Sequence, residues 1–479
     1  MYAIIILLLI VGMVALYDLI QRNHTILRNY PIVGHFRYWI ERFGPEIRQY
    51  IIANDREEQP FNRRSRAWVY ATSKGESNVF GFGTDADLDK PGHVIIRPSI
   101  MPASANAHAE HEPRCAKIMG PNRRKPYRPS IIGISGMSYG ALSGAAVSAL
   151  NQGAKMAGVY QNTGEGGLSE FHKSGADIIF QIGTAYNGVR NEDGTFSRLK
   201  LKMLIDENPF IRAIEIKLSQ GAKPGKGGIL PGVKVSVKIA AARGIKAGQD
   251  SISPPRHSAF NNIRELVDFI EELAELTGLP VGIKSAVGRL EDWDELASIM
   301  ASTGRGPDFI TIDGGEGGTG AAPISFADNM ALPFNEAFTS VRKIFARHNI
   351  ERVVFVGSAK LGIPSMAIKA YAMGVDVVNV GREALFSLGC IQAQKCHTNT
   401  CPASIATQDP RRERNLDVKL KSVRCKNYLK GLMKEVYELT IACGYQHPSQ
   451  IRNTDVLLAT SDAKRYKTIK ELFYDNSSI

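Results

Sequence analysis

The chain is poor in cysteine, and this scarcity excludes one class of protein. Only 6 of its 479 residues are cysteine, too few for the disulfide framework of a secreted protein, so we expect a reducing compartment. Aromatic residues make up 8% of the chain, and they are not interleaved with its basic runs. Because the sequence also has no nucleic-acid-binding motif, we expect no nucleic-acid partner. A hydrophobic content of 44% predicts a globular protein and excludes a disordered one.

Acidic residues are also in short supply. There are 47 of them against 59 lysines and arginines, which gives a formal net charge of +12 and a pI near 9.3. The excess is concentrated in runs at 62–66, 122–125 and 411–414. Such a balance predicts an anionic neighbour. A membrane surface is the favoured one, because each basic residue near anionic lipid contributes about 1 kcal/mol.

The first twenty residues contain no basic residue and form a long apolar segment. Residues 2–17 are uncharged, and the next three extend the segment to the minimum span of about 17 to 20 residues. It has no basic stretch before it and no small-x-small site after it, which excludes a cleavable signal. Because Arg22, Arg28 and Arg37 follow it, the positive-inside rule predicts a single-pass anchor in the inner or plasma membrane with the catalytic domain in the cytoplasm.

Residues 36–52 mix aromatic, apolar and charged side chains. This pattern is typical of a peripheral helix at a membrane interface. An ordinary amphipathic helix on the globular domain has the same pattern, and both interpretations stay open.

From residue 130 onward, short apolar runs alternate with helical patterns. Eight strand-helix units over about 310 residues are the count and size of a TIM barrel. The predicted fold class is α/β, a (β/α)8 barrel preceded by a transmembrane helix and an extension. A doubly wound open sheet needs G-x-G-x-x-G after its first strand, which GISGMSYG does not provide. We predict strands at 131–135, 159–163, 178–182, 213–218, 280–285, 309–313, 353–357 and 377–381, with helices at 141–157, 263–277, 293–302, 335–347 and 364–373.

Glycines and polar residues gather where these strands end, the edge at which TIM barrels carry their chemistry. Glycine-rich loops there let backbone N–H groups approach a phosphate closely, most often after strands seven and eight. The segments after the last three strands therefore predict a phosphorylated cofactor. The candidate residues in them are Gly314, Gly315, Gly357, Ser358, Gly381 and Arg382.

Charged residues at other strand ends are candidates for chemistry. Lys284 ends an apolar strand, where it would pair with an electron-rich ring or form a simple ion pair. Glu165 lies between glycines and would transfer a proton or form a loop ion pair. Gln220, Lys223 and Arg243 would suit a dicarboxylate substrate, although surface basic residues would have the same spacing.

Three of the six cysteines, Cys390, Cys396 and Cys401, lie within twelve residues. In a reducing compartment such a group predicts metal binding or catalysis. With His397 it would supply four zinc ligands, but adjacent ligands are hard to direct at one ion and the usual C-x2-C spacing is absent. His108, His111 and Cys115 also have ligand-like spacing, and there we favour loop packing.

Six segments together resemble the FMN-containing synthase domain of glutamate synthase, and more closely the short, stand-alone members of that family. The match runs from about residue 130 to 410. The resemblance implies a barrel that binds FMN and a 3Fe-4S cluster and takes electrons from a donor such as ferredoxin. It further implies synthesis of glutamate from 2-oxoglutarate and ammonia through 2-iminoglutarate, by an oxidoreductase acting on CH-NH2 donors. The segments are GISGMSYGALS, NTGEGG, LSQGAKPGKGGILPG, SISPPRH, DGGEGGTGAAP and CHTNTCPASIATQDP.

The resemblance also assigns roles by position. It implies that Gln220, Lys223 and Arg243 hold 2-oxoglutarate, with Lys223 and Glu165 catalytic. It places the flavin against Met137, Ser138, Gln181 and Lys284, with its phosphate in the loops at Gly357 and Gly381. It makes Cys390, Cys396 and Cys401 the cluster ligands. The domains predicted are an anchor at 1–24, an extension at 25–129, a synthase barrel at 130–445 with an iron-sulfur loop at 390–401, and a tail at 446–479.

The chain departs from the large enzymes of the family in three ways. Lys226 stands where they have an acidic residue, and Ile229 where they have a glutamine that contacts substrate. Losing that amide would admit a different acid or nitrogen donor. The mature amino-terminal cysteine of a glutaminase is missing too, so nitrogen would come from free ammonia, an amine or a separate glutaminase subunit.

Two other functions stay open. The same cofactors would serve a dehydrogenase of an amino or hydroxy acid that delivers electrons to a membrane carrier, which the predicted anchor would suit. A barrel with a structural zinc clip would instead be a binding scaffold without catalysis.

Overall fold

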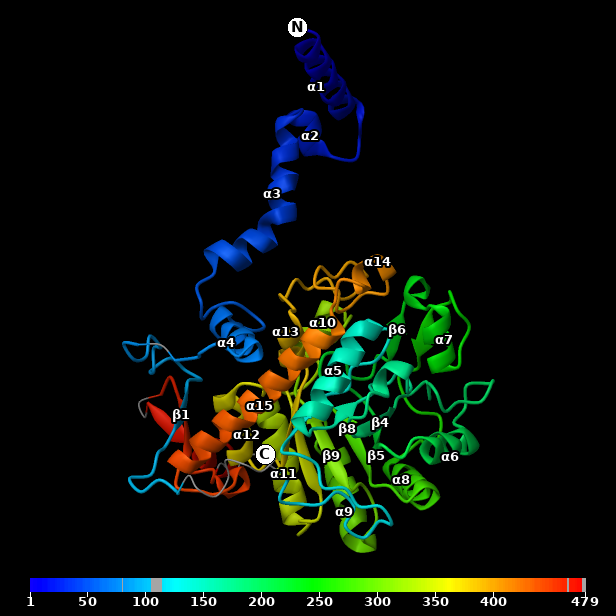
Figure 1. The fold of residues 1–479 in the computed structure, drawn as a ribbon, viewed down its shortest axis with the longest axis vertical. Helices are drawn as coiled ribbons and strands as arrows, with labels where there is room; N and C mark the ends of the chain where they lie inside the picture. Colours follow the sequence, from blue (N-terminus) through cyan, green and yellow to red (C-terminus); the bar gives the residue numbers. More distant parts are fainter. Residues whose placement is uncertain (80, 105–113, 463–464, 476–479) are drawn as a thin grey trace. The chain divides into compact units, whose positions relative to one another are not determined.

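The computed structural model describes all residues except 80, 105–113, 463–464 and 476–479 (Figure 1). His108 and His111 lie outside the described residues. The chain divides into two compact units, residues 1–67 and 68–479.

The first unit is helical. It contains α1 (Tyr2–Ile20), α2 (Thr25–Asn29), α3 (Val33–Ile47) and a π-helical turn, η1 (Arg48–Ile52), and α4 (Arg63–Lys74) crosses its boundary with the second unit. Within the described residues, α1 is the one helix long and apolar enough to cross a membrane, with a mean hydropathy of 2.8. The helix lies where the apolar segment predicts it.

The second unit is built around a closed barrel of eight strands. The strands follow one another around the barrel in chain order, β11 pairs with β2 to close it, and every pairing is parallel. The predicted (β/α)8 barrel is confirmed, and each predicted strand overlaps an observed one. The observed strands are β2 (Ile132–Ile134), β3 (Gln161–Asn162), β4 (Ile178–Ile182), β5 (Ile211–Lys217), β8 (Val281–Ser285), β9 (Phe309–Asp313), β10 (Val354–Ser358) and β11 (Val377–Val380).

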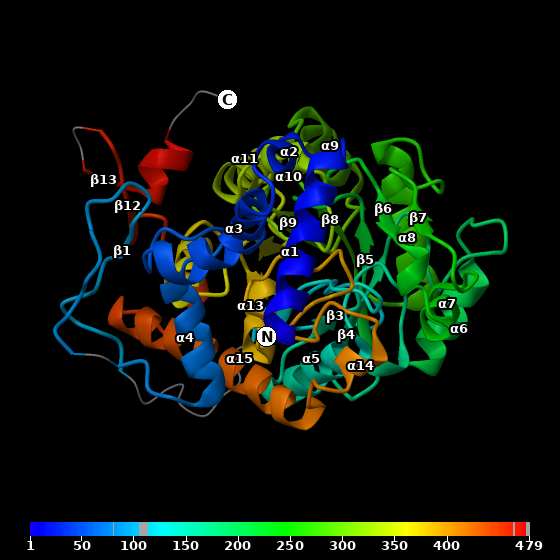
Figure 2. The same cartoon turned by 90° about the horizontal axis from the view of Figure 1, so that it is seen from above.

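Helices surround the barrel, as Figure 2 shows from above. Their ends follow ordinary capping chemistry: Asn262 caps α8 by accepting from the Glu265 N–H, and Gly278 ends it with φ +76°. The five predicted helices are present within a few residues of their predicted bounds. The helices are α5 (Gly144–Ala157), α6 (Arg198–Glu207), α7 (Val237–Arg243), α8 (Ile263–Thr277), α9 (Glu291–Thr303), α10 (Ile324–Asn329), α11 (Phe334–Arg347), α12 (Pro364–Ala372), α13 (Arg382–Leu388), α14 (Pro410–Glu413) and α15 (Val418–Ala442).

Two small sheets and short turns complete the unit. β1 (Val94–Ile96), β12 (Val456–Ala459) and β13 (Tyr466–Thr468) form one antiparallel sheet, which brings together residues more than 300 positions apart. β6 (Gly228–Leu230) and β7 (Ser251–Ser253) form the other. The turns are η3 (Glu170–His172), η4 (Gly232–Lys234), η5 (Pro448–Gln450) and η6 (Lys470–Tyr474).

The barrel interior changes character from one end to the other. Because side chains alternate along a strand, every second residue points inward. Apolar side chains fill the end of the barrel where the strands begin, among them Ile179, Ala213 and Phe309. Two positions further along the same strands stand Gln181, Glu215 and Thr311, all buried, and beyond them Lys217 and Asp313. The core thus sits at the amino ends of the strands, and the polar chemistry sits at their carboxyl ends.

Gly133 of β2 is tightly packed inside this core. A Cβ atom there would lie 2.1 Å from Cζ of Tyr160, a ring that is fully buried in the barrel. We predict that Gly133→Ala lowers the free energy of unfolding by about 1–3 kcal/mol or more, because overpacking forces the ring to move. Urea denaturation followed by circular dichroism measures the loss.

The matched control is Gly288→Ala, where a Cβ would meet nothing within 4 Å. We expect it to change stability by about 0.5 kcal/mol or less. Equal losses in the two variants would contradict the predicted packing at Gly133.

Candidate active site

Glu165 stands in the glycine-rich loop after β3, at the carboxyl end of the barrel. Lys217, at the end of β5, places its Nζ 3.2 Å from Glu165 Oε2 and donates to Gln220 Oε1 at 2.5 Å. These residues and Lys223 line one small cavity of about 20 Å³. The structure therefore brings together Glu165, Gln220 and Lys223, three residues selected from the sequence.

The ionisation of Glu165 is set by its neighbours. Burial raises the pKa of this carboxyl, but the surrounding cations outweigh burial and hold the pKa below its ordinary value. Those cations are Lys217, Lys223 and Arg243, in decreasing order of effect. Burial lowers the pKa of Lys223, and Glu165 opposes that change. Glu165 is thus a carboxylate at neutral pH, able to accept a proton or attract a cation.

Arg243 lies behind this cavity and does not line it. Arg243 is 5% exposed, and its guanidinium donates to Ser251 Oγ at 3.1 Å and to the Tyr139 carbonyl at 3.5 Å. Its Nε is buried with no hydrogen-bond partner in the described part of the chain. A buried cation with a spare donor can receive a further oxygen ligand, which suits a carboxylate.

Gln181 belongs to a buried network centred on Glu215. Glu215 Oε1 accepts from Gln181 Nε2 at 2.6 Å and from Asn162 Nδ2 at 2.8 Å, while its Oε2 accepts from Thr311 Oγ at 2.6 Å. A carboxylate can only accept, so it fixes which end of the Gln181 amide faces it. The amide oxygen of Gln181 is turned the other way, as an acceptor for another group.

Lys284 makes the ion pair that its position at a strand end allows. Its Nζ lies 3.6 Å from Asp313 Oδ1, and both side chains are buried. The second oxygen of Asp313 accepts from the Gly221 N–H at 2.8 Å, and a Cβ on Gly221 would lie 1.8 Å from the Gly314 carbonyl oxygen. The loop that carries Gln220 and Lys223 is therefore held directly over the end of β9. A role for Lys284 beside a flavin stays a prediction.

The loops after β10 and β11 fit a phosphate group. Gly381 precedes the first turn of α13, where no side chain caps the helix, and a Cβ there would meet nothing nearer than Ser135 Cβ at 3.8 Å. Burial lowers the pKa of Lys360, and the charge of Arg382 lowers it further. Open backbone N–H groups beside two cations are suited to a phosphate.

The remaining glycine candidates have packing roles. A Cβ on Gly357 would lie 2.9 Å from the Phe334 ring, so its missing side chain accommodates α11. Gly315 donates to the Leu332 carbonyl at 2.9 Å. Ser358 accepts from the Gly314 N–H at 3.1 Å through its carbonyl. Contact of a cofactor with Gly314, Gly315, Gly357 or Ser358 stays a prediction.

Met137 and Ser138 lie in the loop after β2, packed against the loop that carries Glu165. A Cβ on Gly164 would be 2.6 Å from the Ser138 nitrogen and 3.0 Å from that of Met137. Since Gly164 has φ +65°, only glycine adopts this turn without strain and clash. Both loops are therefore fixed together at the barrel mouth.

The three clustered cysteines lie after α13 as thiols that form no disulfide. Lys234, 3% exposed, donates to the Cys396 carbonyl at 2.9 Å. Burial raises the pKa of the Cys396 thiol, and Cys401 raises it further, which places these two close together. Within the described part of the chain, no three His, Cys, Asp or Glu side chains are grouped closely enough to hold a metal ion. The donor chemistry of the three thiols fits an iron-sulfur cluster, although they are not grouped as a ligand set in the part of the chain that the structure describes.

Comparison with known proteins decides the family. Residues 112–446 match the model described as the conserved region in glutamate synthase. The chain belongs to the glutamate synthase family. A glutamate synthase large subunit-like protein, YerD of Bacillus subtilis (strain 168), is 41% identical over 92% of this chain and 91% of its own length.

Other family members are longer than this chain. The archaeal glutamate synthase [NADPH] of Methanocaldococcus jannaschii is 34% identical over 67% of this chain, which spans 60% of that enzyme. The ferredoxin-dependent glutamate synthase 2 of a Synechocystis strain is 32% identical over 70% of this chain and 22% of its own length. A mandelate oxidase structure with (S)-4-hydroxymandelic acid gives a TM-score of 0.48 at 18% identity over 82% of this chain and 99% of that one.

The two departures from the large glutamate synthases both face outward. Ile229, on β6, is 60% exposed and pairs with Ile252 of β7. Lys226 lies over the ring of Phe326 at 5.2 Å. Neither residue lines the cavity beside Glu165. Ile229 therefore does not supply the substrate contact that the resemblance implies for a glutamine at this position.

The sequence did not identify Glu215 or Lys217 as functional. Both lie in IRAIEIK, which reads as a β-strand with scattered charges. One signal was available in the sequence. The two charged residues are two positions apart in a predicted barrel strand, so both side chains point to the same face, the barrel interior.

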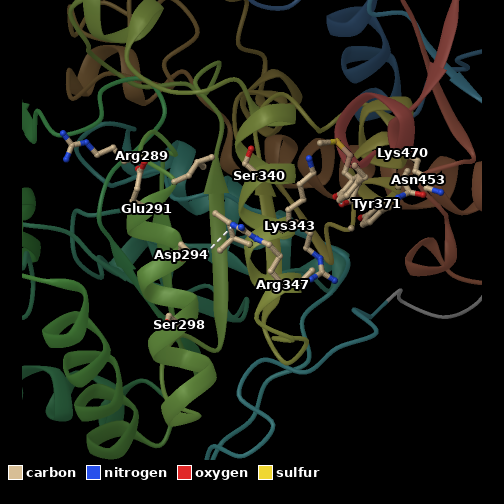
Figure 3. Close-up of a pocket in the computed structure, with 18 of the residues that line it drawn as sticks. Arg289, Glu291, Asp294, Ser298, Ser340, Lys343, Arg347, Tyr371, Asn453 and Lys470 are labelled. Atoms are coloured by element: carbon tan, nitrogen blue, oxygen red, sulfur yellow. Dashed lines mark hydrogen bonds and ion pairs between the residues drawn. The ribbon is translucent and has the colours of Figure 1, made fainter. Parts of the chain in front are cut away.

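A larger groove of the second unit is separate from this site. It has a volume of about 2020 Å³ and lies between α9, α11 and the C-terminal segment. Figure 3 shows Asp294, Lys343 and Arg347 on its walls. Its lining includes none of the candidate residues. Because TIM-barrel enzymes carry their active sites at the carboxyl ends of the strands, the smaller cavity there is the better candidate for an active site.

Glu215→Gln tests the buried network. The new amide can keep its oxygen toward Asn162 and Gln181 and donate to the Thr311 hydroxyl, which rotates to accept, but none of these hydrogen bonds is then made to a charged group, and each is weaker. We predict a decrease of about 1–3 kcal/mol in the free energy of unfolding, measured by urea denaturation.

The control makes the same change at the surface. Glu272 pairs with Arg198 on the outside of the barrel, and Glu272→Gln should cost about 0–1 kcal/mol. A loss at position 215 no larger than the one at position 272 would show that the carboxylate is not needed there.

Proposed function

We propose that this chain is an oxidoreductase that forms glutamate by reductive amination of 2-oxoglutarate with ammonia or an amine, through 2-iminoglutarate. One observation carries the proposal: Glu165, Gln220 and Lys223 surround a single cavity at the barrel mouth in a member of the glutamate synthase family. The relatives named as glutamate synthases support the reaction class. Ferredoxin or a similar protein is the proposed electron donor, and a separate glutaminase is a proposed source of ammonia.

The side chains divide the work by charge. Lys223 lines the cavity and meets one carboxylate of the substrate, and Arg243 behind it attracts the dianion by its charge. Gln220, held by Lys217, orients the substrate by hydrogen bonding. Glu165 is kept ionised by its cations, so it attracts ammonium and accepts the proton released when nitrogen adds to the keto carbon. The loops packed over Gly164 and Gly221 exclude water from this step.

FMN and an iron-sulfur cluster are the proposed cofactors. FMN supplies a hydride acceptor and donor, and a 3Fe-4S cluster supplies single electrons. The open backbone at Gly381, with Lys360 and Arg382, would hold the FMN phosphate. Gln181 and Lys284 would face its ring, and Cys390, Cys396 and Cys401 would bind the cluster.

The proposed location is a membrane surface. α1 would cross the inner or plasma membrane and leave the barrel in the cytoplasm. The absence of any basic residue before Arg22 and the apolar length of α1 support this orientation.

The reaction is tested with purified protein whose flavin and iron contents have been measured. Reduced anaerobically with dithionite, it should form glutamate from 2-oxoglutarate and ammonium in a single turnover. Glu165→Gln should lose most of this activity while retaining its flavin. If a different 2-oxo acid oxidises the reduced flavin and no glutamate forms, the proposal is refuted and the amino- or hydroxy-acid dehydrogenase is favoured. Absence of both flavin and iron would favour a binding scaffold.

Lys217→Met tests how Glu165 is kept ionised. Without this cation, burial raises the Glu165 pKa, so the carboxylate takes up its proton at a higher pH. We predict that the acid limb of the kcat/KM profile moves to higher pH by about 1–3 pH units. Lys238→Met is the matched control, because Lys238 forms a surface ion pair with Glu170 at 2.9 Å. Identical profiles for the two variants would exclude this role for Lys217.

A further inference from the structure

α3 carries a stripe of exposed apolar side chains. Phe36, Trp39, Ile40, Phe43 and Ile47 are 64%, 64%, 50%, 57% and 39% exposed. Their spacing of three and four residues puts them on one face of the helix. An exposed row of three aromatic and two aliphatic residues is costly in water, so this face is built to be covered.

The start of α3 is joined to the end of α1. The Ile32 N–H donates to Asp18 Oδ2 at 2.9 Å, and His35 Nε2 lies 2.9 Å from Asp18 Oδ1. Asp18 is fully buried by this corner. Arg28 Nε donates to the Leu19 carbonyl at 3.3 Å. These bonds keep the first turn of α3 beside the last turn of α1.

The corner also marks a change of polarity. α1 is uncharged before Asp18, and its apolar side chains are exposed around it. After residue 20, arginines appear: residues 21–52 contain five of them and two glutamates. The polar end of α1 therefore lies beside the start of α3, where the apolar stripe begins. Basic residues beside Trp and Phe at this level are typical of helices in a lipid interface.

We infer that α3 lies in the surface of an anionic bilayer, with its stripe toward the acyl chains and its arginines among the headgroups. The surface-bound helix then forms a second attachment beside α1 and holds the segment that leads to the catalytic unit close to the membrane. This attachment requires α1 to enter the membrane, and it is independent of the reaction proposed for the barrel.

Trp39 allows α3 to be observed by itself. The chain has three tryptophans, and α1 contains none of them. The full chain with Trp68→Phe and Trp293→Phe is reconstituted into vesicles of phosphatidylcholine and phosphatidylglycerol. Phospholipid brominated near the glycerol end of its chains should then quench Trp39 about twofold more than lipid brominated near the methyl end, because interfacial helices enter only about 5–10 Å.

Two variants that introduce the same negative charge, one on the apolar stripe and one on the opposite side, form a matched pair. Phe43→Glu, on the stripe, should abolish most of the quenching although α1 keeps the protein on the vesicles in a flotation assay. Gln49→Glu adds the same carboxylate on the opposite side and should leave the quenching unchanged.

Three results would overturn the inference. Trp39 unquenched in protein that floats with vesicles would show that the catalytic unit or another protein covers the stripe. Stronger quenching by deep bromines would show that α3 crosses the bilayer. Protein that fails to float would remove the membrane altogether. Glutamate formation measured in the same preparations keeps these outcomes separate from failure of the proposed reaction.

Discussion

Closing eight strands into a barrel forces every second side chain into an interior that water does not reach. Each polar group placed there must find a partner, and Glu215 shows how the chain meets that demand. Its carboxylate takes hydrogen bonds from three other strands, β3, β4 and β9. The network lies between an apolar floor and the charged barrel mouth, so the positions of the residues above it depend on the same pairings. Satisfying one buried charge thereby gives the site a rigid base.

Charge at the barrel mouth is arranged around a single carboxylate. The positive groups nearest Glu165 come from β5, from the loop after it and from the end of α7, three segments that meet because β6 and β7 fold back over the barrel. Three cations, Lys217, Lys223 and Arg243, act on Glu165, so this part of the mouth carries a net positive charge. That charge suits the dianionic substrate proposed above better than a neutral one.

Much of the fold was predictable, because strand periodicity and loop glycines are local signals. All eight barrel strands and the five helices named from the sequence are present. α15 was missed because its 25 residues are rich in lysine and lack a clear apolar stripe, and the β1–β12–β13 sheet was missed because it joins distant segments. Within the site, the sequence selected Glu165, Gln220 and Lys223 through their glycine-rich loops. It could not reveal that Lys217 pairs with Glu165, that Arg243 lies behind the cavity or that Ile229 faces outward, since each depends on how β5, β6 and β7 pack in three dimensions.

The pairing of β1 with β12 determines how far the chain can be shortened at its two ends and still fold. The region that matches the family model, 112–446, omits all three strands of the sheet they form. That sheet packs against α12, so a fragment trimmed to the family boundaries would expose the covered side of α12 to water and invite aggregation. The smallest piece expected to fold by itself therefore begins before Val94 and continues past Thr468. It includes at least 40 more residues than the region that matches the family model, 18 at the amino end and 22 at the carboxyl end.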